Sequence, residues 1–555
     1  MESIENTARK YAVKNAFEHK GSAQTGAVIG KIKALFPEVD LKTIGPKVSK
    51  IINEVNSLDK SELDKEYKKF ESQGWELKQV EKEKTLPQLE WFKEGDEIIT
   101  RVAPNPSGAM HFGHARPAIL TDEYVRRYGG KLFVRFDDTD PKIKKPLEGI
   151  EKEFLEEFSW LDIKVAGISN ASNNLKRYYQ IIEELIKKDK AYICFCESEK
   201  WKSLIWKGKE CPCRKKSAKE QLENWKKMLK HEIKEGEAVL RIKSDLKQKD
   251  TSLIDWWLAK IVDKVEHPNK NAINNHVWPS YNFASAIDDH DMKINFIIRG
   301  QEHISNEKKQ RQLYEIFNWT YPHTMYHGKV SKVGDMILSK SKIKTLMEKE
   351  GLTRDDDPRL ATLKSFRRRG FSPIAIRKVI TDAAISLKEV KIDLANFAFR
   401  NKEITGEVTN YPFIEEGVEC QVIGIREGEV NYYGEKIKLK NVVEKFVLDK
   451  KEILKFKAGD IIRLKNAFNI KFNEISEFGA TANFISFESG NKPVVNWLVI
   501  GSESDASVLM SDGSKKVGLS TRNIKENSGI IHFLGIGYVN IENKNSAINC
   551  IFSYK

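Results

Sequence analysis

Residues 101–141 read RVAPNPSGAMHFGHARPAILTDEYVRRYGGKLFVRFDDTDP. The first part is rich in proline and glycine, which predicts an irregular loop that ends in HFGH. The residues from Ala115 to Tyr128 then show helical spacing, and Gly129-Gly130 predicts the stop. Lys131 to Phe136 reads as a buried strand that ends in an acidic cluster. This order is half of a mononucleotide-binding βαβ unit, so we expect a Rossmann-type α/β core that binds ligands beyond its strand ends.

Two histidines close the loop. His111 and His114 lie at the expected helix start, where imidazole donors and free backbone N–H groups can face one anion. Gly113 between them has no Cβ, so a phosphate or a flat base could approach the backbone closely. Two ordinary loop histidines are the alternative, because short motifs also match by chance.

A second stretch favours the nucleotide site. Residues 337–341 read ILSKS and precede a basic, helical segment. Together, PNPSGAMHFGH and ILSKS resemble the two nucleotide-binding signatures of class I aminoacyl-tRNA synthetases. Phe112 replaces isoleucine in the first signature, and Ile337 replaces the first lysine of the second. RFDDTDP, YNFASAIDDH and FIIRGQEH are similar to the glutamyl/glutaminyl branch, and the resemblance to the archaeal type of glutamyl-tRNA synthetase covers essentially the whole chain.

This resemblance implies roles for four residues around an amino acid. Arg101 would hold the α-carboxylate, Asp137 would take the α-ammonium group, and Tyr281 would frame the pocket. The apolar run from Lys293 ends in Arg299, like a buried parallel strand that opens onto a ligand crevice, where an arginine can hold a carboxylate with two hydrogen bonds. Glutamyl enzymes place an arginine there for the side-chain carboxylate of the substrate, whereas glutaminyl enzymes have a neutral residue. A surface ion pair is the alternative for a lone arginine.

The same resemblance implies an ATP site. His111 and His114 would contact the phosphates, and Lys340 would come from a mobile loop to neutralise the leaving pyrophosphate. This is electrostatic stabilisation with little covalent chemistry by the protein. Magnesium would accompany ATP. The residues expected around ATP are Pro104, Asn105, Gly108, His111, Gly113, His114, Ser339, Lys340 and Ser341.

Four of the six cysteines are clustered in two C-x-C pairs. Cys194 and Cys196 form the first pair, and Cys211 and Cys213 form the second. Two such pairs can close a tetrahedron of thiolates around a structural zinc ion, although C-x-C is tighter than the usual spacing. In the resemblance, many glutamyl enzymes carry zinc here, often with histidine as the fourth ligand where this chain has Cys213. Unliganded thiols are the alternative.

Length and charge restrict the class of protein. The 555 residues predict several domains, and a formal charge of +14 favours an anionic partner such as nucleic acid. No apolar run approaches the ~18 residues of a membrane span. The first residues lack the apolar centre of a signal peptide, so we expect a cytoplasmic protein.

Composition and the resemblance together predict six parts of the chain. Short alternating strands separated by turns predict β-barrels after residue 390, whereas the roles in tRNA binding come from the resemblance. The parts are an N-terminal helical domain (1–95), the first half of the catalytic core (96–190), an acceptor-stem-binding insertion with the cysteine cluster (191–276), the second half of the core (277–340), a helical linking subdomain (341–389) and an anticodon-binding region expected to hold two barrels (390–555).

We therefore expect ATP-dependent attachment of L-glutamate to the 3′-terminal adenosine of tRNA(Glu), with tRNA(Gln) as a further candidate and a monomer as the expected state. In this branch, activation generally needs bound tRNA. A glutaminyl enzyme is the nearest alternative, and Arg299 argues against it. A nucleotidyltransferase that shares the HxGH fold and a tRNA-binding protein without catalysis are more distant alternatives.

Overall fold

The computed structural model describes residues 4–18, 21–36, 41–72, 86–352, 354–440, 442–524, 529–543 and 547–555. Its contacts divide the chain into two compact units, residues 1–83 and 84–555. This division falls before the predicted domain end at residue 95, because Leu89 is buried in the core of the second unit and Trp91 stacks on His323 there. Among the described residues, no helix has both the length and the apolar character needed to cross a membrane.

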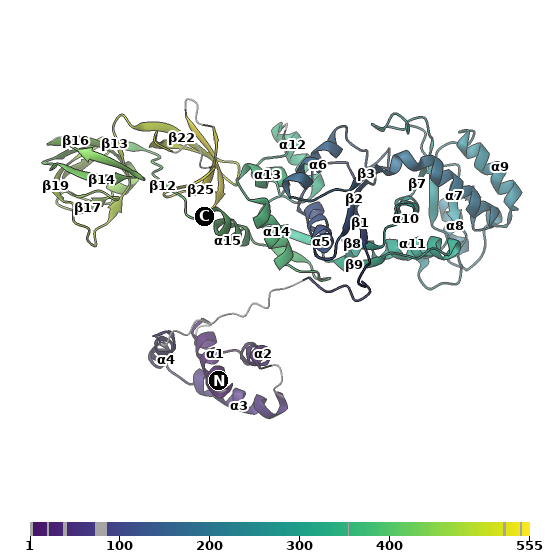
Figure 1. The fold of residues 1–555 in the computed structure, drawn as a ribbon, viewed down its shortest axis with the longest axis horizontal. Helices are drawn as coiled ribbons and strands as arrows, with labels where there is room; N and C mark the ends of the chain where they lie inside the picture. The colour runs from purple at the N-terminus through teal and green to yellow at the C-terminus, as the bar shows by residue number, and fades with distance from the viewer. Residues whose placement is uncertain are drawn as a thin grey trace. The chain divides into compact units, whose positions relative to one another are not determined.

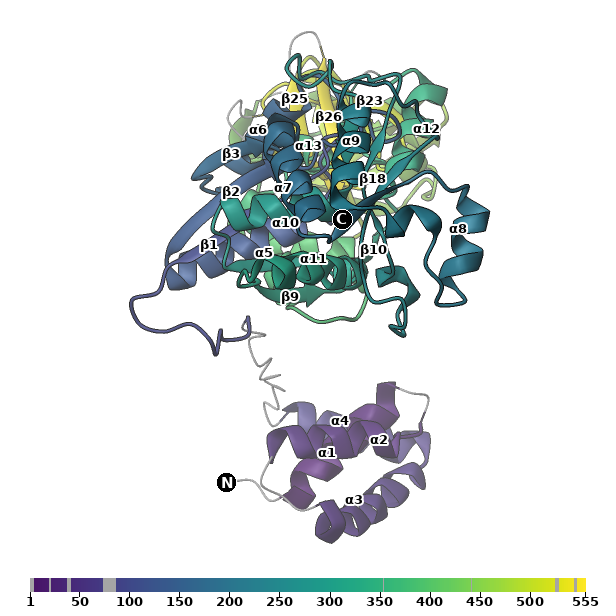
Figure 2. The ribbon, with the colours of Figure 1, turned by 90° about the vertical axis from the view of Figure 1, so that its right-hand side faces the viewer.

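Helices make up the described part of the first unit (Figure 2). Apolar residues with helical spacing, such as Ala8 and Ala12, are buried in its hydrophobic core. Arg9 adds ion pairs to Glu66 at 2.6 Å and to Glu54 at 3.1 Å, which connect the first helix to the fourth and the third. The helices are α1 (Ile4–Glu18), α2 (Thr25–Leu35), α3 (Leu41–Asn56) and α4 (Lys60–Ser72).

A five-stranded parallel sheet lies in the second unit, in the order β3-β2-β1-β8-β9 (Figure 1). The strand order changes direction at β1 and β8, which is where doubly wound sheets bind ligands. The strand predicted from Lys293 begins only at Phe296, because Lys293 has a φ of 58° that is incompatible with a strand. The strands are β1 (Ile98–Val102), β2 (Gly130–Phe136), β3 (Gly167–Asn170), β8 (Phe296–Gly300) and β9 (His323–His327).

Helix α5 (Phe112–Tyr128) connects β1 to β2 and packs on the sheet. It begins at Phe112 rather than at the predicted Ala115, because His111 caps its N-terminus. Its buried face includes Phe112, Ala115 and Ile119, as the helical spacing requires. The other helices of this core are α6 (Ile150–Trp160), α7 (Leu175–Lys187), α10 (Tyr281–Asp291) and α11 (Ile304–Phe317).

A four-stranded antiparallel sheet, in the order β4-β5-β6-β7, interrupts the core between α7 and α10. Trp225 is buried in a hydrophobic core that also contains residues of α7 and α10. The insertion is therefore packed firmly against the helices that flank the parallel sheet. Its elements are β4 (Ala191–Cys194), α8 (Ser198–Ile205), α9 (Ala218–Leu229), β5 (Val239–Ile242), β6 (Trp257–Ile261) and β7 (Val277–Pro279).

The prediction of strands alone from residue 390 was wrong at α15 (Leu394–Thr405). Asp393 caps this helix by accepting a hydrogen bond from the Ala395 N–H at 3.0 Å. Phe397 is buried in the same hydrophobic core as α5, so the helix belongs to the core around the parallel sheet. The elements before it are β10 (Val330–Val333), α12 (Lys340–Glu350), α13 (Leu363–Arg368), α14 (Pro373–Asp382) and β11 (Val390–Ile392), which pairs with β10.

Two larger sheets follow, as expected for barrel-like domains. Their orders are β20-β17-β18-β19-β13-β16-β21 and β12-β24-β25-β26-β22-β23, and β14 pairs with β15. Alternate residues, such as Val418, Cys420 and Val422, point into one hydrophobic core that residues of both sheets share. The elements are β12 (Asn410–Tyr411), β13 (Gly417–Ile423), β14 (Gly428–Tyr432), β15 (Glu435–Leu439), β16 (Val443–Asp449), α16 (Lys450–Ile453), β17 (Ile461–Leu464), β18 (Asn469–Ser476), β19 (Gly479–Ser486), β20 (Val494–Val495), β21 (Trp497–Val499), β22 (Glu503–Leu509), β23 (Lys515–Thr521), β24 (Ile530–Phe533), β25 (Gly537–Asn543) and β26 (Ile548–Tyr554).

Candidate active site

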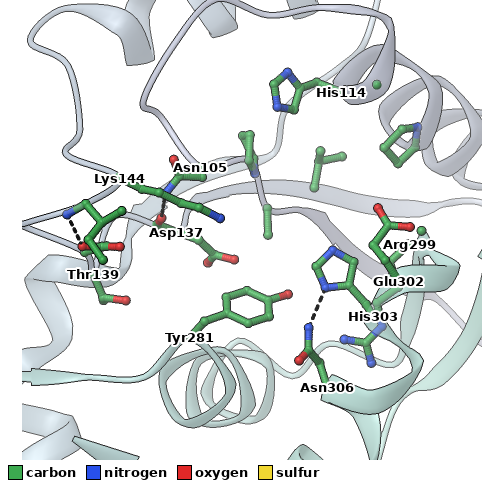
Figure 3. Close-up of a pocket in the computed structure, with 18 of the residues that line it drawn as sticks. Asn105, His114, Asp137, Thr139, Lys144, Tyr281, Arg299, Glu302, His303 and Asn306 are labelled. Carbon is green, nitrogen blue, oxygen red and sulfur yellow. Dashed lines mark hydrogen bonds between the residues drawn. The ribbon is translucent and has the colours of Figure 1, made fainter. Parts of the chain in front are cut away.

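A cavity of about 1020 Å³ opens at the carboxyl ends of the parallel strands (Figure 3). Its walls come from the segments that follow β1, β2, β8 and β9, from the start of α5, and from β6 and β7 of the insertion. The sheet thus brings together side chains that lie far apart in the sequence. The predicted site residues that line the cavity are Arg101, Pro104, Asn105, His111, Gly113, His114, Asp137, Tyr281, Arg299 and Ser339.

The HFGH sequence forms the start of α5. His111 Nδ1 accepts a hydrogen bond from the Gly113 N–H at 3.0 Å, and His114 Nδ1 accepts one from the His111 N–H at 3.4 Å. Because both Nδ1 atoms accept, the hydrogen of each neutral ring is on Nε2. A Cβ at Gly113 would lie 2.7 Å from His111 Cε1, so a larger residue would displace that ring. The pair offers two ring N–H donors beside a helix N-terminus, where an anion is favoured.

The ILSKS stretch ends at the start of another helix. Ser339 is the N-cap of α12, which begins at Lys340, and the hydroxyl oxygens of Ser339 and Ser341 lie 3.1 Å apart. Ser341 and Gly108 are not among the described residues that line the cavity. The side chain of Lys340 lies outside the described part of the structure.

A short segment joins the two signature stretches through the backbone. The Ala361 carbonyl accepts a hydrogen bond from the Phe112 N–H at 3.3 Å, and the Ala361 N–H donates to the Ile337 carbonyl at 2.9 Å. The Leu363 N–H also donates to the Met110 carbonyl at 3.2 Å. The HFGH and ILSKS stretches are therefore held by one backbone bridge, which no sequence motif predicted.

A buried carboxylate holds two arginines at the cavity. Asp289 on α10 accepts hydrogen bonds from Arg101 Nε and Nη2, at 2.9 and 3.0 Å, and from Arg135 Nη1 at 2.6 Å. Burial by itself would raise the pKa of Asp289, but the guanidinium groups of Arg101 and Arg135 outweigh it and lower this pKa to about 2. Asp289 is therefore ionised at neutral pH and fixes the orientation of Arg101.

Asp137 belongs to the same network. Its Oδ1 accepts a hydrogen bond from Arg135 Nε at 2.8 Å, and its carbonyl accepts one from Asn105 Nδ2 at 2.9 Å. Its Oδ2 is buried and has no hydrogen-bond partner among the described residues. Burial raises the pKa of Asp137, while Arg135 opposes that rise. A cation bound at Oδ2 would satisfy this oxygen and favour the ionised carboxylate.

Tyr281 and His303 lie side by side in the cavity, with ring centroids 5.7 Å apart (Figure 3). Tyr281 begins α10 directly after its N-cap, Ser280. Asn306 Nδ2 lies 3.0 Å from His303 Nδ1, so that Nδ1 accepts from the amide and Nε2 carries the hydrogen. Burial, assisted by the charge of Arg299, lowers the pKa of His303 to about 4. The ring is therefore neutral at neutral pH.

Arg299 lies at the end of β8, and its side chain is 5% exposed. Its Nη1 donates to Gln310 Oε1 at 3.1 Å, and its Nη2 donates to the Tyr321 hydroxyl oxygen at 2.5 Å. The Glu307 carboxylate lies 3.6 Å from Nη2, beyond hydrogen-bond distance. Within the described ranges, no carboxylate accepts a hydrogen bond from Arg299, and Glu307 forms only this longer ion pair with it.

The insertion supplies part of the cavity wall. Trp257 and Lys260 of β6 line it, and Lys260 Nζ lies 4.6 Å from the centre of the Trp257 ring. Trp257 is 37% exposed, although it is a large aromatic residue. An exposed aromatic ring beside a cation suits a stacked base and its phosphate.

The four clustered cysteines converge in the insertion. Their Sγ atoms all lie within 4.8 Å of one another, and none of the four forms a disulfide. Cys194 and Cys211 are 3.9 Å apart, and Cys196 and Cys213 are 3.8 Å apart. The Phe195 N–H donates to Cys213 Sγ at 3.4 Å. This donor set fits one tetrahedral metal ion with four sulfur ligands.

The sequence did not reveal the groups that orient the predicted arginines. The sequence did contain a signal for Asp289. Two adjacent aspartates in the largely apolar run YNFASAIDDH indicate carboxylates that need buried partners. Gln310 and Tyr321 had none, since they lie 11 and 22 residues from Arg299 and match no motif.

Comparison with known proteins points to one family. Residues 97–404 match the family model described as "tRNA synthetases class I (E and Q), catalytic domain". The chain is 40% identical to a glutamate–tRNA ligase of Thermococcus kodakarensis and 39% identical to one of Pyrococcus furiosus, over 100% of both chains in each case. It also resembles a crystal structure of a glutamate tRNA ligase from Elizabethkingia meningosepticum, with 20% identity and a TM-score of 0.41 over 56% of this chain and 70% of that chain.

Proposed function

Because the chain belongs to the family of class I tRNA synthetases for glutamate and glutamine, we propose that it is a glutamate–tRNA ligase. The observation that carries this proposal is Arg299, which lines the same cavity as the HFGH stretch and hydrogen bonds only to neutral groups among the described residues. A glutamate side chain would offer this buried guanidinium a carboxylate as hydrogen-bond acceptor, whereas a glutamine side chain would offer it only a neutral amide.

The reaction proceeds in two steps. An α-carboxylate oxygen of glutamate bonds to the α-phosphorus of ATP, and pyrophosphate leaves. A ribose hydroxyl of the terminal adenosine of tRNA then bonds to the acyl carbon, AMP leaves, and the hydroxyl proton is released. Magnesium accompanies ATP and screens its phosphates. The protein contributes position and electrostatic stabilisation to both steps.

The ATP phosphates are assigned to the start of α5. His111 and His114 each use Nδ1 as an acceptor, which places the hydrogen of the neutral ring on Nε2, and the helix N-terminus adds a positive potential for an anion. Lys340, at the start of α12, is assigned to the leaving pyrophosphate. The backbone bridge at Ala361 would keep this loop in register with HFGH. Pro104, Asn105, Gly108, Gly113, Ser339 and Ser341 complete the proposed ATP site.

Glutamate is assigned to the charged wall of the cavity. Asp137 Oδ2 would accept the ammonium group, which would satisfy an oxygen that has no other partner among the described residues. Arg299 would hold the side-chain carboxylate. Arg101 would hold the α-carboxylate through Nη1, because Asp289 takes its Nε and Nη2 hydrogens. Tyr281 would frame the space between these groups.

The remaining parts are assigned to tRNA. The exposed ring of Trp257, next to Lys260, supports placing the acceptor end on the insertion, because both residues line the cavity. The barrel-like sheets would read the anticodon of tRNA(Glu), and the first unit would assist tRNA binding. The proposed state of the chain is a monomer.

The cysteine cluster is assigned to zinc. Cys194, Cys196, Cys211 and Cys213 would provide four thiolate ligands and leave no open position. The ion would connect β4 to the turn before α9 and would take no part in the chemical steps.

Aminoacylation of purified transcripts tests the function. The chain, ATP and magnesium are incubated with tRNA(Glu) or tRNA(Gln) and with radiolabelled glutamate or glutamine. We expect glutamate on tRNA(Glu), and attachment to tRNA(Gln) as well would indicate a ligase that accepts both tRNAs. Attachment of glutamine instead of glutamate would overturn the Arg299 assignment, and no attachment of either would overturn the proposal.

A further inference from the structure

The side chains that accept hydrogen bonds from Arg299 are uncharged. We propose that Gln310 and Tyr321 are positioning residues that fix the Arg299 guanidinium through neutral oxygen atoms, and that they thereby set the preference for glutamate over glutamine. This inference rests on the proposed function and extends it to residues that do not touch the substrate.

Three hydrogen bonds form a closed triangle. Arg299 Nη1 donates to Gln310 Oε1 at 3.1 Å, and Arg299 Nη2 donates to the Tyr321 hydroxyl oxygen at 2.5 Å. The Tyr321 hydroxyl then donates to Gln310 Oε1 at 2.7 Å. Gln310 is fully buried on α11, so water does not compete for these bonds.

The triangle allows one orientation of each group. A guanidinium can only donate, so the Gln310 amide must turn its oxygen toward Arg299. That oxygen also takes the Tyr321 hydrogen, which leaves the Tyr321 oxygen to accept from Nη2. Two rigid acceptors therefore fix both Nη atoms of the guanidinium. Arg299 is already ordered before the substrate binds, so substrate binding does not bear the entropy cost of ordering it.

A second arginine of the cavity, Arg101, is hydrogen bonded to a carboxylate instead of to neutral groups. Arg101 donates two hydrogen bonds to the Asp289 carboxylate, which offsets its charge. Arg299 instead meets an amide and a phenol, and the Glu307 carboxylate lies 3.6 Å away and accepts a 2.7 Å hydrogen bond from Arg311. A carboxylate in direct hydrogen-bond contact would weaken the attraction that Arg299 exerts on a ligand more than Glu307 does at 3.6 Å, where it is shared with Arg311. The neutral acceptors Gln310 and Tyr321 therefore leave more of that attraction for the substrate.

The isosteric variant Gln310→Glu tests the proposal directly. It keeps the shape of the side chain but places a carboxylate against Arg299, where it would replace the charge partner that the substrate provides. We expect the KM for glutamate to rise by roughly tenfold or more, and the ratio of kcat/KM for glutamate to that for glutamine to fall by a similar factor. The KM for ATP should remain within about twofold of the wild-type value, because ATP does not depend on this charge.

Gln312→Glu is the matched control. Gln312 lies on the same helix and takes the same substitution, but its Oε1 accepts from Trp256 Nε1 at 2.8 Å in the insertion and does not contact Arg299. We expect this variant to keep the wild-type KM for glutamate and the wild-type selectivity, since the added charge faces another part of the molecule.

Tyr321→Phe provides an independent test in case Gln310→Glu does not fold. It removes the oxygen that accepts from Nη2 but adds no charge. We expect the KM for glutamate to rise by about threefold to tenfold with little change in kcat, since the guanidinium becomes less well ordered but stays charged. The decline in selectivity should be smaller than for Gln310→Glu.

The kinetics of the full chain with tRNA(Glu) distinguish the outcomes. Selective loss of glutamate use in Gln310→Glu, with Gln312→Glu unchanged, supports the proposal. Wild-type glutamate KM and selectivity in Gln310→Glu, or an equal rise of the glutamate and ATP KM values in the folded variants, would overturn it while leaving the proposed function intact. A wild-type chain that attaches no glutamate would overturn the proposed function, and this inference with it.

Discussion

Arg101 and Arg299 show that one residue type takes two electrostatic states in a single cavity. Arg101 is offset by the Asp289 carboxylate, whereas Arg299 is held by the neutral oxygens of Gln310 and Tyr321. The Glu307 carboxylate lies 3.6 Å from Arg299 and also accepts a hydrogen bond from Arg311, so the guanidinium can still gain a carboxylate acceptor from a ligand. The free energy of binding a second carboxylate should therefore depend more strongly on Arg299 than on any surface cation.

Arg299→Ala should lower kcat/KM for glutamate roughly a hundredfold, because the buried substrate carboxylate loses its hydrogen-bond partner. This factor corresponds to a loss of about 3 kcal/mol of transition-state stabilisation. The KM for ATP should change little. Steady-state aminoacylation measures both constants. Arg177→Ala, which removes only an exposed ion pair with Asp291, serves as the control and should match the wild type. An unchanged kcat/KM for glutamate in Arg299→Ala would refute the assignment.

His303 should make the protein sensitive to mild acid. Burial and the charge of Arg299 lower its pKa from 6.5 to about 4 in the folded protein. Below pH 6.5 the unfolded chain therefore takes up a proton that the folded chain does not. The stability of the folded protein that depends on neutral His303 is fully present above pH 6.5 and is lost as the pH falls toward 4. The melting temperature of His303→Gln should fall less between pH 7 and pH 5 than the melting temperature of the wild type. Parallel melting curves of the two proteins over this range would rule the shift out.

Among the helices and strands, local sequence patterns correctly predicted those that local interactions determine. The helix of HFGH and the strand that ends at Phe136 follow from turn residues and apolar spacing, and both form. The start of α15 was missed because the apolar residues after Val390 fit a strand as well as a helix, and Phe397 is buried through a tertiary contact. The bridge at Ala361 was missed because backbone bonds between distant segments leave no residue signature.

Gly113→Ala should disturb the start of α5. The new Cβ would lie 2.7 Å from His111 Cε1, so the His111 ring must leave its cap position. We expect kcat for activation to fall by roughly tenfold or more, with a smaller effect on the KM for glutamate, because the displaced ring is assigned to the ATP phosphates. Gly490→Ala is the matched control, since its Cβ meets no atom within 4 Å. Pyrophosphate exchange in the presence of tRNA measures both variants, and equal rates would contradict the assignment.

The cysteine cluster should bind one zinc ion per chain. Cys211→Ser should lose the ion and lower the melting temperature of the insertion, because a structural site contributes its binding free energy to folding. Cys420→Ser, outside the cluster, should retain one zinc ion. Elemental analysis of freshly purified proteins gives the stoichiometry. Wild-type protein that lacks metal and takes up no stoichiometric zinc on titration would remove the site.

At the scale of the whole molecule, the C-terminal sheets are joined to the catalytic core within the second unit. Arg369, which follows α13, is almost fully buried. Its Nε donates to the Phe552 carbonyl at 3.0 Å and its Nη2 donates to the Ser553 carbonyl at 2.5 Å, both on β26. Three adjacent arginines in the sequence gave no sign of which one is buried, since only the assembled sheet supplies those carbonyls.

Arg369→Met should lower the free energy of unfolding by about 3 kcal/mol, because two buried carbonyls lose charge-assisted hydrogen bonds. Its neighbour offers a matched control. Arg368→Met removes a partly exposed pair with Glu542 and a longer, 3.3 Å pair with Asp356, and should cost less than Arg369→Met. Thermal unfolding of both variants gives the comparison, and equal melting temperatures would show that Arg369 does not secure the sheet.

The most direct measurement is amino-acid-dependent exchange of radiolabelled pyrophosphate into ATP, with the purified chain and tRNA(Glu) present. The assignment of Arg299 to the side-chain carboxylate predicts rapid exchange with glutamate and exchange with glutamine that is slower by about a hundredfold or more, since an amide cannot replace the charge-assisted hydrogen bonds of a carboxylate. Equal exchange with both amino acids, or exchange that requires neither, would contradict the account of this cavity.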